Sequence, residues 1–80
     1  MSMALANLAD FIIKSLIDET KTVQIAEIEQ GNDIVLEVHL PKDEMGKVIG
    51  KQGKTIRAIR TIVNAAAQNQ GKHASIELLE

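Results

Sequence analysis

Two glycines separated by two polar residues stand in the most basic part of the chain, in the segment Gly50-Lys51-Gln52-Gly53. Glycine takes backbone angles that are closed to other residues, and its missing Cβ lets a ligand approach the main chain. If Gly53 opens a helix, the loop amides and the positive end of the helix dipole converge on one place, which suits a phosphate group. Lys51 would then supply a positive charge and Gln52 a hydrogen-bond donor.

The charges of the chain are segregated around this loop. Residues 47 to 60 include five basic residues and no acidic one, whereas the remaining chain has four basic and eleven acidic residues. A net charge of −2 therefore hides a basic patch on an acidic body. A cluster of charges alone is more often a solvated helix face, but the glycines favour a localised anion site. The basic residues are Lys47, Lys51, Lys54, Arg57 and Arg60.

Aliphatic residues on both sides of the loop complete the predicted site. Ile49 and Ile56 can form an apolar floor on which bases lie while the loop grips their phosphates, although an ordinary core position is an equally open interpretation for both. The strand predicted over residues 34–40 would supply the opposite wall, with Val38 and Leu40. Core positions are expected for Val48, Ile59, Ile62 and Val63.

Hydrophobic periodicity predicts the elements that hold the loop. We expect helices over residues 7–17, 43–49 and 54–69, and strands over 23–29, 34–40 and 74–79. The first helix should begin with Asn7 as cap and Asp10 three residues later, after residues 1–6 that are either frayed or helical. Phe11 lies off the apolar stripe of that helix, so it should be half-exposed and either closes the edge of the core or contacts another subunit.

The order of these elements defines the expected architecture. A short turn over residues 30–33 makes the first two strands an antiparallel hairpin, and a crossover through two helices makes the third strand parallel to the second. The chain is thus predicted to be a single α+β domain over residues 1–80, of order α-β-β-α-α-β. Its three helices should pack on one face of a three-stranded mixed sheet.

Composition excludes several classes of function. The chain has no cysteine, and His39 and His73 alone do not make a zinc site, so we expect no metal and no cofactor. The loop lacks the spacing of a Walker sequence and no catalytic acid pair or triad stands out, so the protein is not expected to be an enzyme. The sequence has no apolar run long enough for a membrane span and no secretory signal pattern, which predicts a cytoplasmic protein.

The nine residues Val48-Ile49-Gly50-Lys51-Gln52-Gly53-Lys54-Thr55-Ile56 resemble the signature of KH domains, apolar-Ile-Gly-x-x-Gly-x-x-Ile. Their place between two helices, after a strand, resembles the KH core, and the additional helix and strand before it resemble the bacterial, type II arrangement. In size, the chain is similar to the small single-KH RNA-binding proteins of bacteria.

This resemblance implies a bacterial RNA-binding protein of low specificity, with RNA chaperone activity and a link to cell shape, envelope growth and cell division. It assigns single-stranded RNA to Gly50, Lys51, Gln52 and Gly53, with Ile49 and Ile56 in the groove and Lys47, Lys54 and Arg57 around it. It further implies a homodimer, or a heterodimer with a larger Jag-type KH protein.

Three other functions satisfy parts of the same pattern. Single-stranded DNA remains possible because a phosphate grip does not read a 2′-hydroxyl group. A helix-turn-helix that binds DNA also has two helices joined by a glycine turn, but it does not need the predicted sheet. A protein-interaction module that uses the long helix and Phe11 is compatible with RNA binding.

Overall fold

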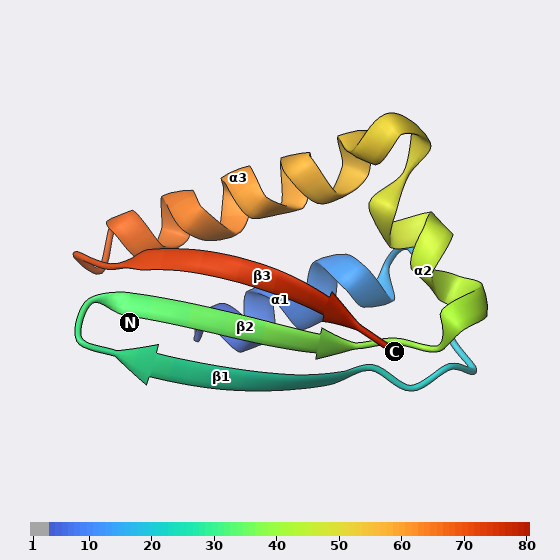
Figure 1. Cartoon of the computed structure of the whole chain (residues 1–80), viewed down its shortest axis with the longest axis horizontal. Coiled ribbons are helices and arrows are strands. Elements are labelled where there is room, and N and C mark those ends of the chain that lie inside the picture. Colours follow the sequence, from blue (N-terminus) through green and yellow to red (C-terminus); the bar gives the residue numbers. More distant parts are fainter. Residues whose placement is uncertain (1–3) are drawn as a thin grey trace.

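The computed structural model describes residues 4–80, and its elements follow the predicted order (Figure 1). They are α1 (Leu5–Lys14), β1 (Gln24–Gln30), β2 (Asp33–His39), α2 (Lys42–Ile49), the one-turn 3-10 helix η1 (Lys51–Gly53), α3 (Lys54–Gln68) and β3 (His73–Leu79). The prediction of an α+β fold with order α-β-β-α-α-β is confirmed.

The three strands form one sheet in the order β1-β2-β3. β1 and β2 pair antiparallel, with Ile25 opposite Val38, and β2 and β3 pair parallel, with Leu36 opposite Ile76. Both the hairpin and the crossover connection were predicted from the sequence. β2 is the central strand, so β1 and β3 each have one free edge.

The core lies between the sheet and the helices, which cover one face of it (Figure 1). Alternation places Ile34, Leu36 and Val38 of β2 on the covered face, where all three are buried. From α3, an i, i+3, i+4 pattern buries Ile56, Ile59, Val63 and Ala67 against them. Within residues 4–80 no helix has the length and the hydrophobicity that crossing a membrane requires.

The first helix begins earlier than the capping pattern predicted. α1 starts at Leu5, its N-cap is Ala4 without a side-chain hydrogen bond, and the prediction that Asn7 and Asp10 cap the helix is wrong. Leu5 is buried with Ala9 and Ile13, so hydrophobic packing, and not a polar cap, determines where this helix starts. Of the segment 1–6 predicted to be frayed or helical, residues 1–3 lie outside the described part.

Two hydrophobic side chains are more exposed than predicted. Ile62 was expected in the core but is 50% exposed, because it lies about 100 degrees around α3 from the centre of the buried stripe. Phe11 is 69% exposed and therefore does not close the edge of this core. Both side chains leave apolar surface on the helical layer.

Candidate nucleic-acid interface

The loop between α2 and α3 has the shape that its glycines predict. Gly50 ends α2 with φ 75° and ψ 173°, and Gly53 precedes α3 with φ 73° and ψ 15°. Between them the chain makes one 3-10 turn, in which the Gly53 amide donates a hydrogen bond to the Gly50 carbonyl at 3.1 Å. Gln52 also has a positive φ, 58°, which is uncommon for a residue with a Cβ.

Gly50 is required for a second reason, which is the approach of the next helix. A Cβ at this position would lie 2.6 Å from Thr55 Cβ and would also overlap Thr55 Oγ1. At Gly53 the nearest atom to such a Cβ is Arg57 Nη1 at 3.5 Å, an ordinary contact. The first glycine therefore lets the first turn of α3 close onto the loop, whereas the second provides only its backbone angle.

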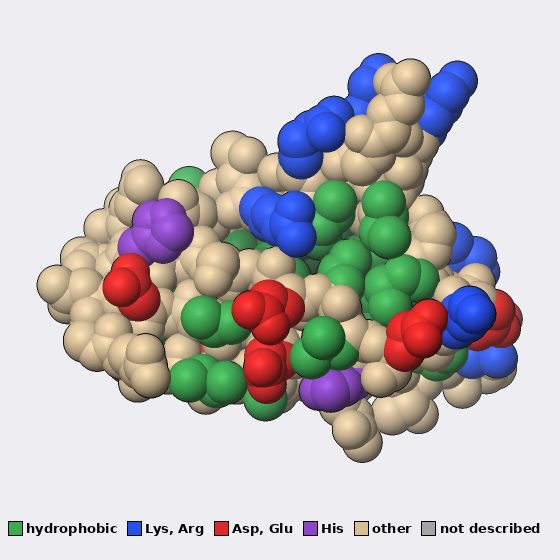
Figure 2. All heavy atoms as spheres, viewed as in Figure 1, with side chains coloured by type: hydrophobic (Ala, Val, Ile, Leu, Met, Phe, Trp, Pro, Cys, Tyr) green, Lys and Arg blue, Asp and Glu red, His purple; other side chains and the backbone are tan. Residues whose placement is uncertain are grey.

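The loop presents a concentrated positive charge. Lys51, Gln52 and Lys54 are exposed, and the first turn of α3 contains no acidic residue. Within residues 4–80 no side chain caps this helix, so the electropositive N-terminus of α3 faces outwards from the loop. Figure 2 shows the lysine and arginine side chains gathered on the part of the molecule that projects at the upper right, where Figure 1 has the loop.

Within residues 4–80, Lys47 differs from the loop lysines Lys51 and Lys54 because it forms an ion pair. Its Nζ lies 2.8 Å from Oε2 of Glu44, a carboxylate that is almost fully buried one turn earlier on α2. The hydrogen bond with Glu44 raises the pKa of Lys47 above its ordinary value near 10.5. Lys47 therefore lies at the rim of the loop with a positive charge whose electric field is partly cancelled by Glu44.

The predicted apolar residues divide between surface and core. Ile49 is 37% exposed beside Gly50, so it can contact a ligand. Ile56 is 5% exposed and belongs to the core.

The prediction that the second strand forms the opposite wall of the groove is wrong. Val38 and Leu40 are buried, because β2 is the central strand and its covered face is filled by helices. The strand beside α3 is β3, the free edge of the sheet (Figure 1). Hydrophobic side chains lie in the angle between the basic projection and the sheet (Figure 2). Near the end of β3, Leu78 is half-buried and packs against the core.

Two side chains that the sequence interpretation did not place connect α3 to this edge. Arg60 Nη2 donates a hydrogen bond to the Ile76 carbonyl at 3.1 Å, and the Ala74 amide donates one to Asn64 Oδ1 at 3.0 Å. Counting from Gly53, positions 57, 60 and 64 repeat at intervals of three and four residues, so they share one flank of α3. That spacing is the signal in the sequence from which this flank could have been found.

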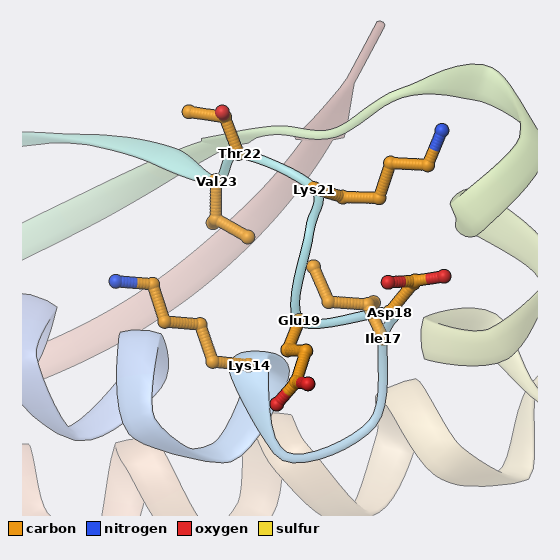
Figure 3. A pocket seen from close by; sticks show the side chains of 7 residues that line it. All are labelled: Lys14, Ile17, Asp18, Glu19, Lys21, Thr22 and Val23. Atoms are coloured by element: carbon orange, nitrogen blue, oxygen red, sulfur yellow. The ribbon is translucent and has the colours of Figure 1, made fainter.

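A surface hollow of about 340 Å³ lies away from the loop, between the end of α1 and the start of β1. Figure 3 shows its lining, which includes Lys14, Glu19 and Val23. Asp18 also lines this hollow, and hydrogen bonds from the amide and hydroxyl of Thr20 lower its pKa. Two acidic and two basic residues line this hollow, so it offers no concentrated charge for an anionic ligand.

The core of the fold is a strand, two helices joined by a Gly-x-x-Gly turn, and a strand parallel to the first. A helix and a strand precede this core. This arrangement defines the protein as a KH domain. Residues 6–78 match the family model described as "KhpA/KhpB, KH domain", and the chain belongs to this family.

Full-length relatives support the same assignment. A Clostridium acetobutylicum protein named "RNA-binding protein KhpA" is 42% identical over 72 residues, which cover 90% of this chain and 96% of the relative. Proteins of the same name from Aquifex aeolicus and Chlamydia trachomatis are 40% and 37% identical, over 96% and 88% of this chain and 98% and 90% of theirs. The printed names describe a KH domain and RNA-binding proteins and no enzyme, in agreement with the prediction from the sequence.

Proposed function

We propose that this protein binds short single-stranded RNA in the angle between the Gly-x-x-Gly loop and the β3 edge. The observation that carries the proposal is the loop itself, where two glycines at positive φ expose Lys51 and Gln52 at an N-terminus without acidic residues. The relatives' printed name, which states RNA binding, supports the same function. One such groove accommodates about four nucleotides.

The contacts that this site offers predict low specificity. The chain has one aromatic residue, Phe11, and it lies on α1 and not near the loop, so stacking on a ring does not contribute. Affinity then rests on the backbone grip, on Ile49 and on charge, which read phosphates more than bases. A role as an RNA chaperone or a post-transcriptional regulator fits such weak discrimination, and the link to cell envelope growth and division rests on family resemblance alone.

The direct test exchanges the two exposed loop residues for aspartate, Lys51→Asp with Gln52→Asp. We expect affinity for a labelled six-nucleotide RNA, measured by fluorescence anisotropy, to fall at least about tenfold because carboxylates repel phosphate. The matched control is Lys42→Asp with Gln30→Asp, which changes the charge equally at two exposed positions outside the loop. Equal affinity of the loop variant and the control would refute the site.

The same oligonucleotide made as DNA tests the nearest alternative. DNA bound as tightly as RNA would make the protein a binder of single strands in general, since no contact would then depend on the 2′-hydroxyl group.

We also propose that the protein self-associates through the helical layer. The exposed side chains of Phe11 on α1 and Ile62 on α3 support this, since exposed side chains of this size mark contact surfaces when they form a patch. Ile62 lies on the flank of α3 opposite Arg57 and Arg60, so a partner there would leave the loop free. By resemblance, a larger Jag-type KH protein would compete for this surface.

Sedimentation over a range of concentrations tests the self-association. We expect Phe11→Ser and Ile62→Ser each to shift the protein toward monomer. Ile28→Ser, which changes an exposed side chain on the uncovered face of the sheet, should leave association unchanged. A wild type that is monomeric at every concentration would remove this proposal.

A further inference from the structure

The outer edge of β3 is closed along part of its length by side chains from α3. The His73 amide donates to Asn32 O, and Leu79 O accepts from the Leu40 amide, so odd-numbered residues of β3 point their backbone groups toward the rest of the sheet. The even-numbered residues Ala74, Ile76 and Leu78 therefore point theirs to the free edge.

Asn64 and Arg60 occupy the first two of these edge positions. The Ala74 amide is bonded to Asn64, and the Ile76 carbonyl is bonded to Arg60. Helix and strand run in opposite directions, so the next edge position, Leu78, lies nearer to the loop (Figure 1). Within residues 4–80, the free edge is thus bonded to α3 at the end far from the loop and has no such bond at the end near it.

The backbones of α3 and β3 diverge in the same direction. Figure 1 shows α3 close to β3 at its C-terminal end and rising away from the strand toward the yellow loop segment. Figure 2 shows hydrophobic side chains between the basic projection and the sheet. The one basic residue bonded across the two elements within residues 4–80 is Arg60.

We propose that Arg60 closes the narrow end of the RNA groove and contacts the nucleotide that reaches it. One guanidinium nitrogen holds the Ile76 carbonyl, and the remaining N–H donors of an arginine can bind a phosphate or a base edge at the same time. Arg57 and Arg60 lie on the same flank of α3 as Gly53, which precedes the helix. Along the helix axis, Arg57 lies about 6 Å and Arg60 about 10 Å from Gly53. Arg60 therefore sets how far a strand held by the loop can run. The proposal rests on the proposed function.

The experiment measures affinity against oligonucleotide length, using uridine strands of four, six and eight nucleotides. Arg60→Met removes the guanidinium and keeps an unbranched stem, and we expect it to weaken binding of the four-nucleotide strand about three- to tenfold. Because the narrow end is open without Arg60, the loss of affinity should become smaller as the oligonucleotide lengthens. Lys14→Met, the same charge change on α1, should leave every affinity within about twofold.

A second variant separates the closing role of Arg60 from its charge. It also keeps the test valid if Arg60→Met does not fold. Arg60→Lys keeps the charge but lacks the planar fork, so we expect a smaller loss with the same dependence on length. Circular dichroism melting checks the fold of both. A loss by the same factor at every length, or no loss, would overturn the closing role.

The failure of this inference can be told from failure of the proposed function. If the Lys51 and Gln52 double variant also binds as the wild type does, the site itself is wrong. If that variant loses binding while the Arg60 variants do not, only the role of Arg60 is wrong.

Discussion

At the scale of single residues, Gly50 is the position on which the shape of the loop depends. It combines a positive φ with a contact to Thr55 that leaves no space for a Cβ, whereas Gly53 has the positive φ alone. Gln52 takes a similar backbone conformation with a side chain in place. These three positions therefore separate steric exclusion from backbone strain.

We expect Gly50→Ala to lower the free energy of unfolding by about 2–4 kcal/mol, through strain and overpacking together. Gly53→Ala should cost about 1 kcal/mol, since only the backbone angle opposes it. Gln52→Gly should change stability by less than about 1 kcal/mol, because relief of the positive φ offsets the added freedom of the unfolded chain. Urea denaturation measures all three, and equal losses at positions 50 and 53 would contradict the steric role of Gly50.

Lys47 and Lys51 have the same charge and different surroundings. Lys51 is exposed in the loop, whereas Lys47 is held by the buried carboxylate of Glu44. Because its pKa is raised, the pairing contributes to folding below the ordinary value near 10.5 and is lost as pH rises through the raised value. Lys47 therefore keeps its positive charge throughout neutral pH.

Neutralising these two lysines should consequently have unequal effects on RNA binding. We expect Lys51→Ala to weaken binding about fivefold or more and Lys47→Ala about twofold, since Glu44 already screens the second. Anisotropy titrations at one fixed salt concentration compare them. The reverse order would mean that Lys47 leaves Glu44 to meet the ligand.

At the scale of elements, local patterns were sufficient to predict most of the fold. Alternating residues identified β2, a short polar turn identified the hairpin, and the order of elements identified the parallel crossover. The two glycines identified the loop between α2 and α3. Each of these features depends on neighbours in the sequence.

The features that were missed depend on tertiary packing. The start of α1 follows from burial of Leu5, and the position of β3 beside α3 follows from the strand order. The contacts of Arg60 and Asn64 with β3 were not predicted because their partners lie 16 and 10 residues away in sequence. Ile62 was assigned to the core because the helical pattern does not give the width of the buried stripe. That width depends on what packs against the helix.

The two isoleucines that flank the loop should separate stability from binding. Ile56→Ala removes a buried side chain and should cost about 2–4 kcal/mol of unfolding free energy. Ile49→Ala should cost less than about 1 kcal/mol because this side chain is partly exposed, yet it should weaken RNA binding. Urea denaturation combined with anisotropy tests both, and a large stability loss at Ile49 with unchanged binding would assign this residue to the core alone.

At the scale of the whole molecule, segregated charge orients the protein toward its ligand. Five basic residues lie between positions 47 and 60, and the remaining surface is acidic. An acidic body repels a nucleic acid everywhere except at the loop, so association should be directed to one face.

RNA affinity should therefore fall with salt. If three or four phosphates are neutralised, a plot of log affinity against log salt concentration should have a slope of about −2 to −3. The Lys51→Ala variant should reduce this slope by about 0.7. A slope near zero would show that charge does not drive binding.

The measurement that tests the central claim most directly is the mapping of bound RNA onto the protein by amide chemical shifts. We expect a short single-stranded RNA to shift the amides of residues 47–60 and of the C-terminal half of β3, and to leave β1 and α1 unchanged. Shifts concentrated on β1 or α1, with an unchanged loop, would contradict the assignment of the Gly-x-x-Gly loop as the RNA site.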